Sequence, residues 1–117
     1  MRLVINDNTP TTGIQLYQDY ANARRVENNA FEDIYIGHWN LAEIERTDSN
    51  FVGIELKRSQ YSNIGYNKFS NISLRSLHTG ILFSTDGVGA HNTNDNVFEN
   101  VSIKAVTKGI SFQANSK

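Results

Sequence analysis

Four carboxylates are the residues most suited to acid–base chemistry in this 117-residue chain. Enzymatic hydrolysis of a glycosidic bond uses two carboxyl groups, about 5–5.5 Å apart for retention of configuration or about 6.5–9.5 Å apart for inversion. One acid stands in a short strand-like segment, and three others occur close before it. We therefore expect any catalytic pair to come from Glu55, Glu43, Glu45 and Asp48. The alternative for each of them is a solvated surface acid.

An aromatic residue among these acids predicts sugar binding. Trp39 is the only tryptophan of the chain, and both an imidazole and a guanidinium lie near it in sequence. An aromatic ring can pack on the C–H face of a pyranose while polar groups bind its hydroxyls. The predicted carbohydrate-binding residues are Trp39, His38, Arg46 and Tyr35. The alternative is that Trp39 packs beneath an ordinary extra strand.

Other kinds of site find little support in the composition. The chain has no cysteine, which excludes disulfides, thiolate catalysis and most structural zinc sites. His78 and His91 have no partners at metal-binding spacing, so we expect no metal site and no cofactor. The net charge is −1, and acidic and basic residues are scattered along the sequence, so no basic patch is indicated that would bind nucleic acid. No stretch approaches about 18 apolar residues, so we expect no membrane insertion.

Two repeated sequence motifs, which we call words, predict the strands that must position these residues. The word N-x-F-x-[ND]-[IV]-x-[IL] occurs at 29–36, 67–74 and 96–103, and G-I-x-[LF] occurs at 13–16, 53–56, 80–83 and 109–112. The words interleave strictly, and inside each one apolar and polar residues alternate, which is typical of strands. A fixed order of strands at a period near thirty residues indicates a solenoid. We predict an all-β parallel β-helix of about three to four coils over residues 1–117.

Equivalent positions of the words predict columns of stacked side chains. Each buried apolar member contributes about 1.5–3 kcal/mol. The asparagine-rich positions are expected at bends, where an Asn or Asp side chain can bond its own backbone, tolerate a left-handed conformation and bond its neighbour along the axis. The apolar columns are Phe31-Phe69-Phe98, Ile34-Ile72-Val101, Ile14-Ile54-Ile81-Ile110 and Leu16-Leu56-Phe83-Phe112, and the polar columns are Asn29-Asn67-Asn96 and Asp33-Asn71-Asn100.

One interval departs from the repeat. From Asn29 to Gly53 is 24 residues, whereas the same interval is 13 residues from Asn67 to Gly80. The extra 11 residues fall within about 37–50 and contain Trp39. Insertions in solenoids form loops that often carry the binding face, so this insertion is the best site candidate in the sequence.

The repeats resemble the right-handed parallel β-helix of the pectate-lyase-like superfamily, which includes polysaccharide lyases, glycoside hydrolases and bacteriophage tailspikes. The resemblance runs from about Thr12 to Phe112 and rests on the scaffold words. Lyase chemistry in this superfamily requires a calcium-binding acid cluster and a basic proton acceptor. Lys57 and Arg58 follow Glu55, but no matching aspartate cluster is present, which favours a glycoside hydrolase over a lyase.

The predicted stack is short. About three and a half coils at roughly 4.8 Å each span only about 17 Å. No amphipathic helix is available to cover the ends, although solenoids generally need capping units. We expect a segment of a longer β-helix or a chain whose ends are covered by partner chains; the alternative is a self-sufficient short β-helix.

Three functional interpretations follow. The first is part of a bacteriophage tailspike or tail fibre, a homotrimer in the virion tail or outside the cell, that binds a bacterial surface polysaccharide, with or without degrading it. The second is a fragment of a secreted polysaccharide lyase or glycoside hydrolase. The third is a structural β-helix spacer or adhesin segment without a ligand of its own.

Overall fold

Strands make up nearly all of the part of the chain that can be described. The structure is a computed structural model and describes residues 2–5, 12–17, 25–38, 51–58, 63–85 and 92–113. Within these ranges no helix occurs, and so none that could cross a membrane. The prediction of an all-β chain is confirmed for these residues. The strands are β1 (Arg2–Ile5), β2 (Thr12–Tyr17), β3 (Arg25–Glu27), β4 (Ala30–His38), β5 (Val52–Arg58), β6 (Asn63–Gly65), β7 (Lys68–Thr85), β8 (Asn92–Asn94) and β9 (Val97–Gln113).

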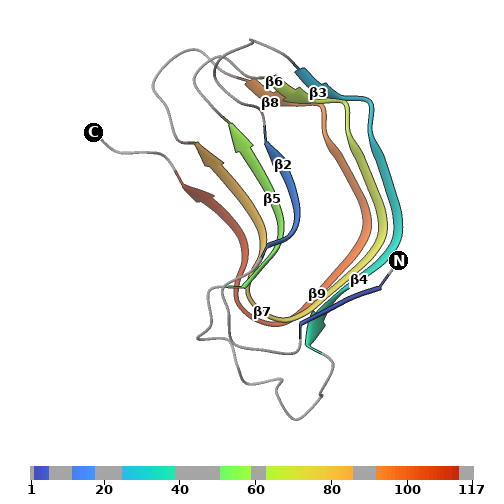
Figure 1. Cartoon of the computed structure of the whole chain (residues 1–117), viewed down its shortest axis with the longest axis vertical. Coiled ribbons are helices and arrows are strands. Elements are labelled where there is room, and N and C mark those ends of the chain that lie inside the picture. The colour runs from blue at the N-terminus through green and yellow to red at the C-terminus, as the bar shows by residue number, and fades with distance from the viewer. Residues whose placement is uncertain are drawn as a thin grey trace.

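The strands form two stacked sheets in which the described pairings are all parallel. One sheet has the order β1-β4-β7-β5-β2, with β9 paired to β7, and the other has the order β3-β6-β8. Figure 1 shows why β7 joins β4 to β5: β7 and β9 run down one side, turn together at the bottom and return along the other side. This arrangement of parallel strands is consistent with the predicted β-helix.

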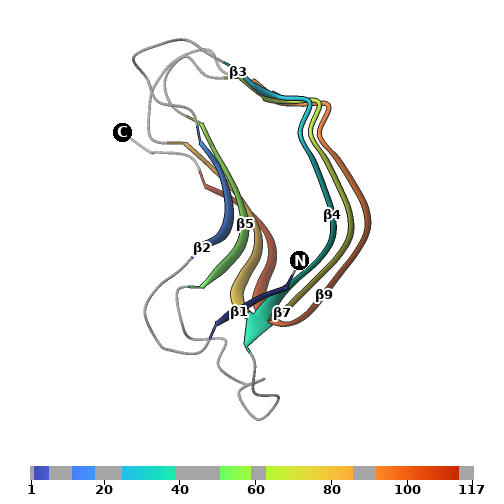
Figure 2. The same cartoon turned by 45° about the vertical axis from the view of Figure 1, so that its right-hand side comes forward.

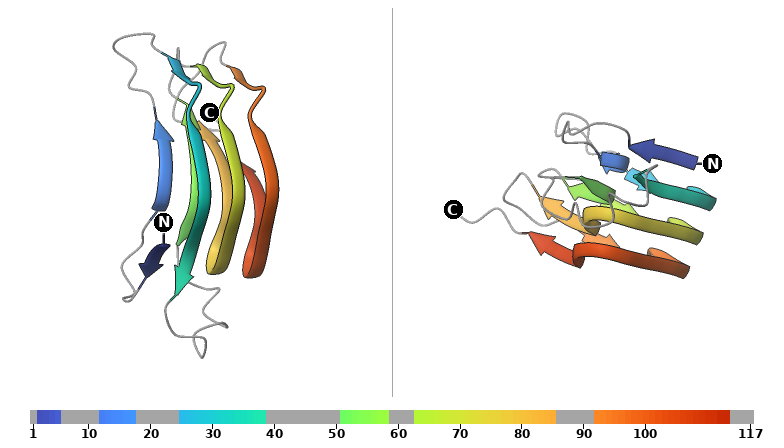
Figure 3. Two further views of the ribbon diagram at one scale, coloured as in Figure 1. Left: turned by 90° about the vertical axis from the view of Figure 1, so that its right-hand side faces the viewer. Right: turned by 90° about the horizontal axis from the view of Figure 1, so that it is seen from below.

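The stack has two walls on opposite sides. The first wall consists of β4 with residues 68–75 of β7 and 97–104 of β9. The second wall consists of β2 and β5 with residues 79–85 of β7 and 108–113 of β9. Figure 2 shows the small sheet that contains β3 at the upper end of the first wall, and Figure 3 shows the strands of both walls stacked in successive layers.

The phenylalanine column of the first wall is confirmed by register and by ring geometry. Phe31 pairs with Phe69, and Phe69 pairs with Phe98. The rings stack with centroids 4.9 Å and 4.7 Å apart and planes within 10° of each other. Because each ring is covered by the ring of the next coil, Phe69 in the middle is completely buried.

The other three apolar columns are also confirmed. On the first wall, Ile34 pairs with Ile72 and Ile72 with Val101. On the second wall the two columns of the shorter word are in register through all four strands. Each column of the core is therefore formed by similar side chains that stack on one another. The core also includes buried residues outside the four predicted columns, namely Ile36, Phe51, Ile64, Leu74 and Leu77.

The column of Asn29, Asn67 and Asn96 is a hydrogen-bonded ladder. The backbone N–H and the side-chain Nδ2 of Asn29 both donate to Oδ1 of Asn67, at 3.1 and 2.9 Å. The same two groups of Asn67 donate to Oδ1 of Asn96, again at 3.1 and 2.9 Å. Nδ2 of Asn67 also donates to the carbonyl of Val26 at 2.9 Å. The predicted bonding along the axis is thus confirmed, and it satisfies polar groups that are buried at Asn67.

Left-handed backbone occurs at two positions of each coil. Asp33, Asn71 and Asn100 have φ of 56°, 53° and 53°, and Nδ2 of Asn71 donates to Asp33 while Nδ2 of Asn100 donates to Asn71. This set was predicted. A second set, Asn28, Tyr66 and Asp95 with φ of 60°, 56° and 56°, stands between the small sheet and the first wall. Asn and Asp tolerate this conformation, whereas a tyrosine adopts it only at a cost of about 1–2 kcal/mol.

Candidate functional site

Glu55 is placed on the outer face of the second wall by its neighbours in sequence. Ile54 and Leu56 are completely buried in the core, so the side chain between them points to the opposite face of the strand. In register, Glu55 lies between Gln15 of β2 and Leu82 of β7. Its exposed fraction is 9%, so it is far less solvated than an ordinary surface acid.

A serine holds the Glu55 carboxylate. The hydroxyl of Ser84 donates to Oε1 of Glu55 at 3.0 Å. Ser84 lies two residues beyond Leu82, so this bond runs diagonally between β5 and β7. A hydrogen bond to an ionised carboxylate is stronger than one between neutral groups. Ser84 therefore fixes the direction in which Glu55 presents its oxygens.

An aromatic ring and a cation occupy the next outward positions. Tyr17 pairs in register with Lys57, and Nζ of Lys57 lies 5.3 Å from the centroid of the Tyr17 ring. The exposed fraction of Tyr17 is 43%, so part of its surface can meet a ligand. We call this group of outward side chains the Glu55 patch; its members are Gln15, Tyr17, Glu55, Lys57 and Ser84.

The Glu55 patch has the chemistry of a binding surface. It combines one aromatic ring with amide, hydroxyl, carboxylate and ammonium groups, which together can pack on a sugar ring and bond its hydroxyls. The residues paired directly with Glu55 are Gln15 and Leu82, so no adjacent coil supplies a second carboxylate at this position. Within the described ranges no three acids or histidines lie close enough to hold a metal ion.

The structure describes only some of the other predicted site residues. Trp39, Glu43, Glu45, Arg46 and Asp48 lie outside the described residues, so their predicted roles stay predictions. His38 ends β4 and pairs with Ile5, but its side chain is not among those described.

Tyr35 lies apart from Glu55. It is half-buried on the first wall, in register with Ser73, whereas Glu55 belongs to the second wall. The structure therefore does not bring these two predicted residues together.

The sequence alone did not point to Tyr17 and Ser84, and it indicated Lys57 only as a basic residue that follows Glu55. A signal for them does exist: each stands two residues after the outward position of a G-I-x-[LF] word, where alternation again points the side chain outward. The cross-strand contact between Glu55 and Ser84 depends on the register of coils 29 residues apart.

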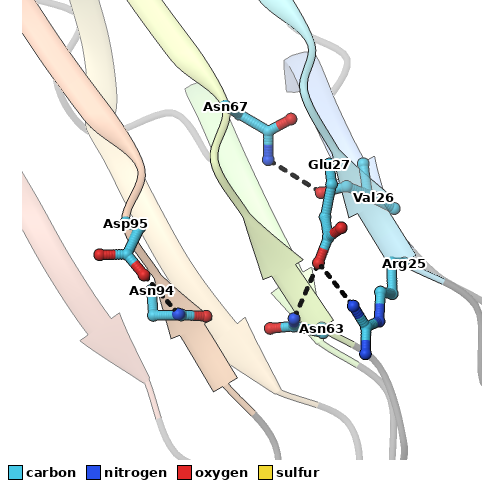
Figure 4. A network of polar contacts seen from close by, with 7 residues as sticks. All are labelled: Arg25, Val26, Glu27, Asn63, Asn67, Asn94 and Asp95. Atoms are coloured by element: carbon cyan, nitrogen blue, oxygen red, sulfur yellow. Dashed lines mark hydrogen bonds and ion pairs between the residues drawn. The ribbon is translucent and has the colours of Figure 1, made fainter.

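A second carboxylate has a structural role in the small sheet (Figure 4). Oε1 of Glu27 accepts a hydrogen bond from Nδ2 of Asn63 at 3.0 Å and lies 3.8 Å from Nη1 of Arg25. In the same region Nδ2 of Asn94 donates to Asp95 at 2.6 Å. The Glu27 contacts join β3 to β6, and the Asn94 contact links two exposed neighbours. The buried Oδ1 of Asn63 has no partner among the described residues.

The acids of the longer word lie two coils apart. Glu32 and Glu99 lie on the outer face of the first wall in the same column, and Ser70 of β7 separates them. Glu99 forms an exposed ion pair with Lys68 at 3.3 Å. An exposed pair of this kind contributes little to stability and leaves the wall a mixed polar surface.

Comparison of the chain with protein-family models, with curated proteins and with solved structures finds no match.

Proposed function

We propose that the chain is a right-handed parallel β-helix of the pectate-lyase-like type, belonging to a bacteriophage tailspike or tail fibre, and that it binds a bacterial surface polysaccharide. In this proposal the protein acts outside the cell or in the virion tail, as a homotrimer. The outer face of the second wall carries the binding residues.

The observation that carries the proposal is the Glu55 patch. A carboxylate fixed by Ser84 stands in the same face as an aromatic ring that a lysine partly covers. Protein sites for sugars combine an apolar ring with a few oriented polar groups. A solenoid also repeats its outer positions at about 4.8 Å along the axis, which suits a polymeric ligand that extends over several coils.

Binding is favoured over catalysis by the residues next to Glu55. A glycosidase needs a second carboxyl group within about 10 Å, and the cross-strand neighbours of Glu55 are an amide and a leucine. Degradation of the polysaccharide would need a second acid near Glu55, and Glu43, Glu45 and Asp48 are the candidates.

The test is incubation of the protein with capsular, lipopolysaccharide and cell-wall polysaccharides, followed by size-exclusion chromatography. We expect at least one polymer to co-elute with the protein at unchanged length. Shortening of a polymer would assign a depolymerase instead, and Glu55→Gln would then test the part of Glu55 in turnover. If no polymer of the panel binds or shortens, the structural spacer becomes the better interpretation.

A further inference from the structure

The first wall becomes basic near the bend at which β7 and β9 turn toward the second wall. At this end β1, β4, β7 and β9 lie side by side (Figure 3). The aligned segments are 2–5, 34–38, 72–79 and 101–108. They contain no aspartate or glutamate, and their lysines and arginines are Arg2, Arg75, Lys104 and Lys108. These cations are scattered in the sequence, and strand register brings them to one end of the wall.

Arg75 and Lys104 are direct neighbours in this region. They pair in register between β7 and β9. Leu74 and Ile103, which precede them, pack in the core, so both charged side chains point to the outer face. Among the register pairs of the described strands, this is the only pair in which both members are charged, and both charges are positive. Like charges directly opposite each other on neighbouring strands are destabilising, so the pair lacks a counter-charge.

The described part of the chain does not supply that counter-charge. The acids of the first wall, Glu32 and Glu99, are in register with Ser70, which lies five residues or roughly 15 Å along the strand from Arg75. Nε of Arg75 is buried and has no hydrogen-bond partner among the described residues. A buried N–H group without an acceptor costs free energy. Arg75 therefore has hydrogen-bonding capacity that an acceptor from outside the chain can use.

A glycine in the neighbouring coil brings a hydroxyl group close to Arg75. Gly37 of β4 pairs with Arg75 on the side opposite to Lys104. A Cβ on Gly37 would lie 3.0 Å from the hydroxyl oxygen of Tyr35 and would run into the carbonyl oxygen of Arg75. The Tyr35 ring therefore reaches over Gly37, and its hydroxyl lies beside the two cations. We call Gly37, Arg75 and Lys104, with the Tyr35 hydroxyl over Gly37, the Arg75 row.

We infer that the Arg75 row binds an oxyanion, that is, a carboxylate, sulfate or phosphate group. Neighbouring strands lie about 4.8 Å apart, so one oxyanion between the two side chains can accept a hydrogen bond from both Arg75 and Lys104. Both bonds are charge-assisted and therefore strong. The bound anion supplies the missing counter-charge and offsets the repulsion between the two cations. The row belongs to the first wall, so this inference does not depend on the Glu55 patch of the second wall.

The same chemistry is presented by a free inorganic ion and by the charged group of an acidic polysaccharide. Arg75 is half-buried, whereas Lys104 is exposed, so a group that is attached to a larger molecule can reach the row from solvent. Nucleic acid is disfavoured, because its binding depends on contacts to many phosphates and the row offers two cations. The experiment therefore compares a free ion with a charged polysaccharide.

The experiment titrates the isotope-labelled full chain with sodium phosphate and, separately, with alginate, a polysaccharide of carboxylated sugars, at constant ionic strength. Nuclear magnetic resonance follows the backbone amides and the Nε–H signal of Arg75. We expect saturable shifts at Arg75 and Lys104, and Arg75→Gln should weaken binding at least about tenfold. Binding of phosphate without binding of alginate would assign a free ion as the ligand. Binding of alginate at a lower concentration of charged groups than phosphate would assign the charged group of a polysaccharide.

Three further variants test the site against simpler explanations. Lys68→Gln removes one positive charge from the same wall outside the Arg75 row, and it should leave binding unchanged. Lys104→Glu should abolish binding and raise the thermal midpoint, because it replaces a repulsive pair by an attractive one. Tyr17→Ala changes the Glu55 patch, and it should bind both anions as the wild-type chain does.

Three results would overturn the inference. The first is the absence of saturable binding by the wild-type chain. The second is equal binding by the wild-type chain and Arg75→Gln. The third is an equal loss in Lys68→Gln and Arg75→Gln, because binding would then follow the net charge of the protein and not a site.

Discussion

The rings of Phe69 and Phe98 stack with their centroids 4.7 Å apart and their planes within 5° of parallel, although 29 residues of chain separate them. The spacing equals the distance between neighbouring strands, so the ring contact and the backbone pairing reinforce each other. On the other side Phe69 meets Phe31 in the same way. The middle ring of this column is therefore where one side chain holds three coils in register.

Phe69→Ala should lower the free energy of unfolding by about 3–5 kcal/mol, because it opens a cavity between two other rings. Urea denaturation followed by circular dichroism measures this change. Phe112→Ala is the matched control: Phe112 is largely exposed and stacks on one side only, so its loss should cost about 1 kcal/mol. Equal costs for the two variants would contradict a core organised in columns.

Asn67→Ala should lower the free energy of unfolding by about 2–4 kcal/mol. The buried side chain accepts from Asn29 and donates to Asn96 and to the carbonyl of Val26, and removal leaves these groups unpaired. Asn94→Ala is the control, since Asn94 is exposed and, among the contacts described, its side chain bonds only its neighbour Asp95. Its effect should stay within about 0.5 kcal/mol.

Tyr66→Asn should raise the free energy of unfolding by about 1 kcal/mol, because asparagine tolerates the left-handed backbone that tyrosine adopts there. Tyr66→Val should change stability in the opposite direction, since a β-branched residue is strained at this φ. Thermal melts of the two variants give the signs. A stabilised Tyr66→Val would show that the backbone conformation is not what limits this position.

Gly80→Ala should destabilise the chain by about 1–3 kcal/mol or more, because its Cβ meets a backbone carbonyl that cannot move aside. Gly109→Ala is the matched control, with open space at the same position of the repeat, and should be neutral or slightly stabilising. Denaturant midpoints measured side by side decide the matter. Similar losses in the two variants would mean that close approach between coils is not the reason for the glycines.

Tyr17→Ala should weaken the binding of a polysaccharide selected from the panel by about tenfold, equivalent to about 1.4 kcal/mol. The expected loss comes from the ring that packs on the sugar. Tyr66→Asn removes another exposed tyrosine, on the corner after the small sheet, and should leave the affinity unchanged. If the corner variant lost affinity and Tyr17→Ala did not, the binding surface would have to be moved to that corner.

The repeat words predicted much of the fold because a solenoid converts sequence period directly into contact. Asn29, Asn67 and Asn96 are equivalent in the sequence repeat, and hydrogen bonds join the same three residues in space. Tyr66 shows the limit of this approach. Its left-handed backbone was not predicted because tyrosine carries no local signal for it, although it occupies the same position of the repeat as Asn28 and Asp95.

The candidate site was predicted less completely than the fold. Glu55 was found from its outward position, but Ser84 and Tyr17 join it only through strand pairing, which acts between residues far apart in sequence. Trp39 and the acids near it were predicted from the chemistry of their individual side chains. Those residues belong to the interval that departs from the repeat, where the period gives no guide to position.

The asparagine ladder also determines how a molecule of this kind can change in length. Asn67 and Asn96 are equivalent and 29 residues apart. Deletion of exactly that many residues would join matching points of two coils, and duplication would add a complete one, with every column still aligned. The coil from Asn29 to Asn67 is 38 residues long, so a whole coil is defined by matching positions and not by one fixed length. A deletion within a strand that removes less than a whole coil would shift the columns out of register. The length of the stack is thus quantised, and whole coils are the units in which it can be shortened or extended.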